Sequence, residues 1–315
     1  MIKKVLLIVL VLGMLVQGAF AQDYAFRVLA SKGQNMVRGS GSDWHALKTG
    51  AKLNKGEEVK LAANGYLGLV HSSGKTMELK EASTYDISKL STELGSSSQN
   101  IASKYADFVM SKMTPEQKEE NRRKYASVTG AAERGSSDAA INIYMPQSVA
   151  VLNNSAVIRW EAVKENAVYI INLKNLFEEK ILVAETSDPF YIIDFNNEQI
   201  KGAIVENLII VSVSLKDDES IASKNAAIEL MTEEDAKTYK VELSGLEANI
   251  GSETSINNLI LAEFYEEKGL VLDAITSYES AVKLSPDVEY FQEAYDEFLI
   301  RNRLKDPSDI DTDKL

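Results

Sequence analysis

The chain has 315 residues, of which 47 are acidic and 34 are lysine or arginine, and its formal net charge is −13. Such an acidic chain is a poor binder of nucleic acid or anionic lipid, because both carry charge of the same sign. The absence of cysteine argues against a small scaffold stapled by disulfides. Only two histidines are present, His45 and His71, which limits histidine-based catalysis and metal binding.

The first residues have the layout of a secretory signal peptide. Lys3 and Lys4 precede the apolar run 5–16, and Ala19-Phe20-Ala21 supplies a cleavage site after Ala21. Twelve residues extend only about 18 Å as a helix, against a hydrocarbon core of about 30 Å. No cysteine follows that could carry a lipid. We therefore expect residues 1–21 to be removed and the mature protein to be periplasmic or secreted, with no stable membrane span.

Residues 22–95 are predicted to form an all-β unit. The short alternating runs EVKLA, YLGLVH and TMELK lie between glycine-containing turns, a pattern typical of half-buried strands. The unit resembles the FecR-type periplasmic domain through Val37, Gly39, Trp44, Leu47, Gly50, Leu53, Gly56, Val59, Gly65, Leu69, Gly74 and Leu79. Trp44 and His45 are candidate binding residues. The competing interpretation makes Trp44 a core residue and His45 its solvated neighbour.

Residues 96–142 are predicted to be a helical connector and a loop. Apolar side chains at helical spacing indicate a helix over 101–113. Thr114 followed by Pro115, with Gln117 three residues after the threonine, indicates the start of a second helix. We assign no function to this connector.

Residues 143–231 alternate short strands with turns and predict a two-sheet β-sandwich of about seven strands. The spacing of Val157, Trp160, Val163, Ala167, Tyr169, Ile171 and Leu173 resembles the front half of a fibronectin type III or related immunoglobulin-like domain. In such domains an aromatic residue on one strand meets a tryptophan in the core. We therefore interpret Trp160 and Tyr169 as core residues, with a sugar-stacking surface as the alternative.

Residues 232–303 are predicted to be helical, and the tail 304–315 to be disordered. Thr232 and Asp235 frame a helix start. The later segment resembles a tetratricopeptide repeat at Leu261, Ala262, Tyr265, Gly269, Ala274, Tyr278, Ala281 and Pro286. One helical pair cannot bury its own apolar faces, so it is expected to dock on neighbouring helices, on the sandwich or on a partner.

The first helix of this pair carries three glutamates, at 263, 266 and 267, that are expected on its exposed side. Glu263, Glu266 and Glu267 are therefore candidates for binding a basic segment of a partner protein. The alternative interpretation is a face that only keeps the helix solvated.

The sequence contains no nucleophile elbow, phosphate loop or zinc-binding helix motif. We therefore expect no enzyme, no catalytic or metal-ligating residues and no cofactor, with a carboxylate-only glycosidase as the remaining catalytic alternative. The leading hypothesis is a non-catalytic periplasmic or envelope protein that binds or scaffolds other macromolecules. The alternative is a periplasmic sensor that binds a small ligand or a cell-wall glycan through the FecR-like domain.

Overall fold

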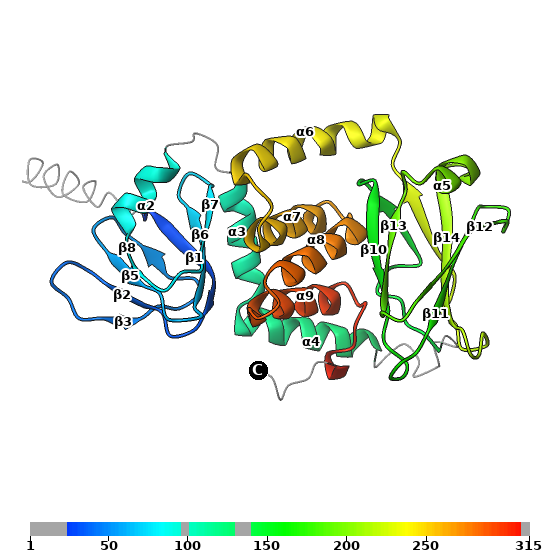
Figure 1. Cartoon of the computed structure of the whole chain (residues 1–315), viewed down its shortest axis with the longest axis horizontal. Helices are drawn as coiled ribbons and strands as arrows, with labels where there is room; N and C mark the ends of the chain where they lie inside the picture. Colours follow the sequence, from blue (N-terminus) through cyan, green and yellow to red (C-terminus); the bar gives the residue numbers. More distant parts are fainter. Residues whose placement is uncertain (1–23, 96–100, 130–139, 310–315) are drawn as a thin grey trace, which may run out of the picture.

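The computed structural model describes residues 24–95, 101–129 and 140–309. Two β domains lie at opposite ends of the molecule, and a block of helices lies between them (Figure 1). The predicted mixture of β and α structure is confirmed. The predicted signal peptide 1–21 and its cleavage site, like the tail beyond residue 309, lie outside the described residues.

The first β domain consists of two four-stranded sheets with the strand orders β4-β1-β6-β7 and β3-β2-β5-β8. Its helix α2 (Ile87–Leu94) starts where Asp86 accepts hydrogen bonds from the backbone N–H groups of Ser88 and Lys89, at 2.7 and 3.1 Å. The strands are β1 (Phe26–Lys32), β2 (Met36–Arg38), β3 (His45–Ala46), β4 (Lys52–Leu53), β5 (Glu58–Lys60), β6 (Tyr66–His71), β7 (Thr76–Leu79) and β8 (Thr84–Asp86).

The second β domain pairs a five-stranded sheet, β12-β11-β14-β15-β9, with the two strands β10 and β13. Trp160 and Tyr169 are each 1% exposed and meet edge to face at 5.2 Å, as expected for core residues. The elements are β9 (Ser148–Val151), β10 (Ser155–Arg159), β11 (Tyr169–Lys174), β12 (Lys180–Thr186), β13 (Phe190–Asp194), α5 (Glu198–Ala203), β14 (Leu208–Leu215) and β15 (Ala226–Leu230).

The helical block joins the connector helices to the C-terminal helices. It consists of α3 (Ile101–Lys112), α4 (Pro115–Thr129), α6 (Glu233–Ile250), α7 (Ser255–Glu267), α8 (Val271–Leu284) and α9 (Glu289–Arg301), followed by the short turn η1 (Pro307–Asp309). Thr232 caps α6 by accepting the backbone N–H of Asp235 at 3.2 Å. Ala262 on α7 and Ala274 on α8 are fully buried in the same core, so the two helices can pack closely.

The helical block contacts the first β domain through α7. Gly68 on β6 lies so close to Ile256 that a Cβ atom there would sit 2.1 Å from the Ile256 Cδ1 atom. The backbone N–H of Ile256 also donates to Glu78 at 3.1 Å. One hydrophobic core therefore contains helical residues together with Leu29 and Tyr66 of the first β domain.

The helical block contacts the second β domain through α8. Asp273, which is fully buried, accepts the backbone N–H groups of Leu152 and Asn153, each at 2.9 Å. Thr276 accepts the backbone N–H of Val157 on β10 at 3.0 Å. The helical pair thus buries its apolar faces on the connector helices and on both β domains.

Among the described residues, no helix is long and apolar enough to cross a membrane.

Candidate functional site

Two of the three glutamates expected to form an exposed acidic face, Glu263 and Glu266, are held inside the protein, whereas Glu267 is exposed. Glu263 is 1% exposed, and its carboxylate accepts from Lys112 of α3. Glu266 forms two hydrogen bonds with Arg301 at the end of α9, at 3.1 and 2.8 Å. The expected exposure is therefore wrong for Glu263 and Glu266. The physical reason is that α3 and α9 cover this side of α7.

Lysines of the same chain occupy the place expected for a basic partner. Lys112 bonds Glu263 and also lies 3.3 Å from Glu266, and Lys104 of α3 bonds Glu267 at 2.8 Å. Glu267 is the outermost of the three, with a side chain that is 35% exposed. The acidic face thus binds a basic helix, as its charge suggested, but that helix is α3 of the same chain.

Two neighbouring carboxylates in this cluster differ in their acidity. Burial raises the pKa of Glu263 to about 7, and the adjacent Glu266 adds to the shift. Burial would also raise the pKa of Glu266, but Arg301 and Lys112 hold it below its ordinary value. Because the folded-state pKa of Glu263 lies above its ordinary value of 4.5, ionising it destabilises the folded state.

The raised pKa of Glu263 predicts that the free energy of unfolding depends on pH through this residue. As pH rises from 4.5 to 7, the wild type should lose stability relative to Glu263→Gln by on the order of 3 kcal/mol, at about 1.36 kcal/mol per pKa unit. Urea unfolding of both proteins at pH 5 and pH 8 measures this difference. Parallel stability profiles for the two proteins would show that Glu263 is not the titrating group.

Trp44 and His45 lie on the surface of the first β domain. Trp44 is half-buried, so the interpretation of Trp44 as a core residue is wrong, while His45 on β3 is exposed. The guanidinium of Arg38 stacks 4.5 Å from the centroid of the Trp44 ring. Glu58 in turn holds Arg38 with an ion pair of 2.6 Å. We call these four residues the Trp44 surface.

The second histidine, His71, lies inside the first β domain and is not accessible to a ligand. His71 is buried, and its two ring nitrogens contact the hydroxyls of Ser73 at 2.7 Å and Ser91 at 2.9 Å. Burial lowers the pKa of His71, and nearby lysines lower it further. Over the described ranges, no group of three or more histidine, aspartate or glutamate side chains could hold a metal ion.

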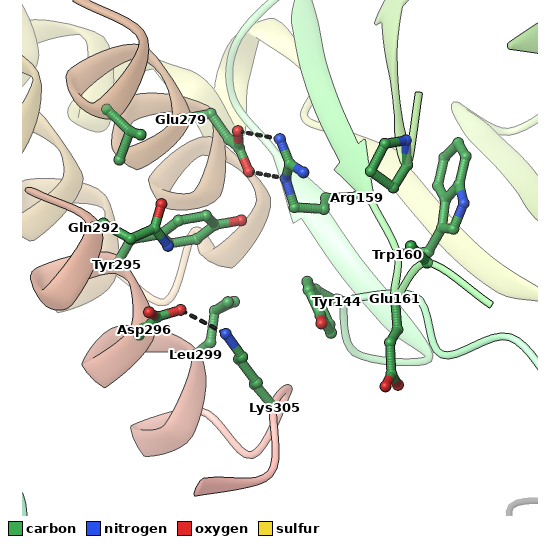
Figure 2. A pocket seen from close by; sticks show the side chains of 13 residues that line it. Tyr144, Arg159, Trp160, Glu161, Glu279, Gln292, Tyr295, Asp296, Leu299 and Lys305 are labelled. Atoms are coloured by element: carbon green, nitrogen blue, oxygen red, sulfur yellow. Dashed lines mark hydrogen bonds and ion pairs between the residues drawn. The ribbon is translucent and has the colours of Figure 1, made fainter. Parts of the chain in front are cut away.

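A pocket of about 280 Å³ lies between the second β domain and helices α8 and α9 (Figure 2). We call it the junction pocket. The β domain contributes Arg159 and Trp160 at the end of β10, with Tyr144, Glu161, Ala162 and Pro189 from neighbouring loops. The helical side contributes Glu279, Val282, Gln292, Tyr295, Asp296, Leu299 and Lys305.

Four of the five charged side chains that line the junction pocket are paired with one another, and the fifth is Glu161. Arg159 and Glu279 form a two-point ion pair across the domain boundary, with Nη2 and Oε2 separated by 2.7 Å. Lys305 bonds Asp296 at 2.8 Å, and both pairs are visible in Figure 2. The hydroxyl of Tyr295 is buried without a hydrogen-bond partner among the described residues.

The sequence contained no signal for this pocket. Arg159 and Glu279 are 120 residues apart, and each is an ordinary charged residue of its own strand or helix. Only the docking of α8 and α9 on the β domain brings them together. Sequence periodicity predicts such elements but not which charged side chains meet across their boundary.

Two of the three carboxylates that line the junction pocket are held in ion pairs. A glycosidase needs one carboxyl that can donate a proton and a second that acts as nucleophile or base. Glu279 and Asp296 are instead each bonded to a cation.

The chain matches no protein-family model, and no curated protein is significantly similar to it.

Proposed function

We propose that this chain is a non-catalytic protein of the bacterial envelope that binds another macromolecule through the Trp44 surface. The helical block serves as the support that holds the two β domains in a fixed arrangement. The sequence resemblances to FecR-type, fibronectin-like and tetratricopeptide modules favour a binding protein, because modules of these kinds serve recognition. The signal-like first 21 residues favour export.

The observation that carries this proposal is the stacking of Arg38 on the half-buried Trp44 ring. Binding hot spots are enriched in tryptophan and arginine, and a side chain that is already ordered loses little entropy on binding. Arg38 lies on the ring at 4.5 Å and is itself held by Glu58 at 2.6 Å. His45 beside it is exposed. The acidic helix face offers no comparable surface, because α3 covers it.

The proposal predicts that Trp44→Ala abolishes partner binding without unfolding the protein. A half-buried ring outside the core adds little to stability, so the melting temperature should shift by no more than a few degrees. Crosslinking in the producing cells followed by mass spectrometry measures partner recovery. The matched control is Phe177→Ala, which removes a 68% exposed aromatic residue from the other β domain.

A partner recovered equally well with Trp44→Ala and the wild type would contradict the proposal. A partner lost with both Trp44→Ala and Phe177→Ala would indicate general surface hydrophobicity as the cause.

The alternative function, sensing of a small ligand or a cell-wall glycan, is favoured by one observation, the junction pocket. That pocket lies at the second β domain and not in the FecR-like domain where sequence reasoning placed it.

A further inference from the structure

We propose that the junction pocket binds a neutral sugar residue. The site is separate from the Trp44 surface, and the inference does not depend on macromolecular binding there. Three properties of the pocket support it: the pairing of its charges, one buried hydroxyl without a partner, and a size that suits a single ring.

The charges of the pocket favour a neutral ligand. Its two cations, Arg159 and Lys305, are each bonded to a carboxylate of the pocket, Glu279 or Asp296. An anionic or cationic ligand would have to compete with one of these pairs. Figure 2 shows the remaining acid, Glu161, directed away from both pairs. A neutral ligand can instead add hydrogen bonds to groups that the ion pairs already hold in place.

The Tyr295 hydroxyl favours a ligand that can form hydrogen bonds. Tyr295 is 3% exposed, and its hydroxyl has no hydrogen-bond partner in the described part of the chain. Figure 2 shows its ring extending from α9 toward Arg159. Buried polar groups are normally satisfied, so an unsatisfied one that lines a pocket indicates a missing partner. The Gln292 side chain, which lines the same pocket, offers a donor and an acceptor.

The size and the apolar parts of the lining favour a sugar ring. The volume of about 280 Å³ lies at the lower end of the roughly 300–1,000 Å³ typical of small-molecule sites. Leu299, Val282 and the rings of Tyr144 and Tyr295 supply apolar surface next to the polar groups. A sugar combines apolar C–H faces with hydroxyls that both donate and accept, which matches this mixed lining.

The test is ligand-observed NMR with the full chain and a panel of glucose, galactose, mannose and N-acetylglucosamine. We expect saturation transfer to at least one neutral sugar. Binding should be about tenfold weaker in Tyr295→Phe, the upper end for loss of one neutral hydrogen bond. The matched control is Tyr290→Phe on the same helix. Its hydroxyl is also buried without a partner among the described residues, but Tyr290 lines a different cleft, so binding should be unchanged.

A second variant tests the role of charge pairing. Glu279→Gln leaves Arg159 without its carboxylate, so this variant should bind glucuronate at least as well as glucose, whereas the wild type should prefer the neutral sugar. The proposal is overturned if no sugar of the panel binds the wild type. Equal sugar binding by Tyr295→Phe and the wild type, or tighter binding of glucuronate than of every neutral sugar by the wild type, would also overturn it.

Discussion

Replacing Arg301 with methionine is expected to lower the free energy of unfolding by about 3–5 kcal/mol, because a buried carboxylate then loses its partner. Arg301 forms both hydrogen bonds to Glu266, whose side chain is 11% exposed. In the variant, Lys112 alone would face two buried carboxylates, Glu263 and Glu266. Urea unfolding at pH 8, where both carboxylates are ionised, measures the loss.

Two further variants make this expectation specific. Adding Glu266→Gln to Arg301→Met removes the stranded charge and should restore part of the lost stability. Arg123→Met is the matched control, since Arg123 pairs with Glu119 on the exposed side of α4, with side chains 75% and 57% exposed. It should change stability by less than about 1 kcal/mol. Equal effects of Arg301→Met and Arg123→Met would show that the buried pair is not a stabilising contact.

Ala274→Trp should destabilise the whole molecule by at least about 3 kcal/mol, at or beyond the upper end of typical overpacking costs. Ala274 is fully buried, with a relative exposure of 0%, and lies in the core shared by α7 and α8. An indole cannot fit without separating the helices. Since these helices also contact both β domains, the unfolding of both domains should shift together.

Tryptophan fluorescence and far-ultraviolet circular dichroism during urea unfolding measure this effect. Lys283→Trp is the matched control, because it adds the same ring at an exposed position of the same helix. An unchanged unfolding midpoint for Ala274→Trp would contradict the close packing of α7 on α8. A shift confined to one part of the molecule would contradict the shared core.

Local sequence signals predicted the elements well. Period-two runs and glycine turns located the strands, and residues such as Thr114 and Thr232 marked helix starts that the structure contains. The core positions of Trp160 and Tyr169 were expected from the resemblance to fibronectin-like domains. These features depend on residues close together in sequence, where periodicity and capping chemistry are specific.

Features that depend on distant residues could not be predicted in the same way. The charge of Glu263 and Glu266 suggested a basic partner, but nothing near them in sequence identified Lys112, 151 residues earlier, as that partner. The sequence left open whether Trp44 is a binding residue or a core residue, and the structure places it half-buried under Arg38. Long-range pairing of this kind is decided by how the domains dock. The charged residues on one helix or strand do not indicate which residues of another element they will contact.

The most direct test of the proposed function is site-specific photocrosslinking in the producing cells. A benzophenone side chain placed at His45 should give a covalent adduct with a partner, because this residue is exposed beside the ordered Trp44 ring. The same probe at Glu267 should give none, although this residue is also exposed, because the glutamate is already bonded by Lys104 of the same chain and has no aromatic ring beside it to anchor a partner. Adducts from position 267 with none from position 45 would contradict binding through the Trp44 surface. They would indicate that the partner binds at the acidic side of α7.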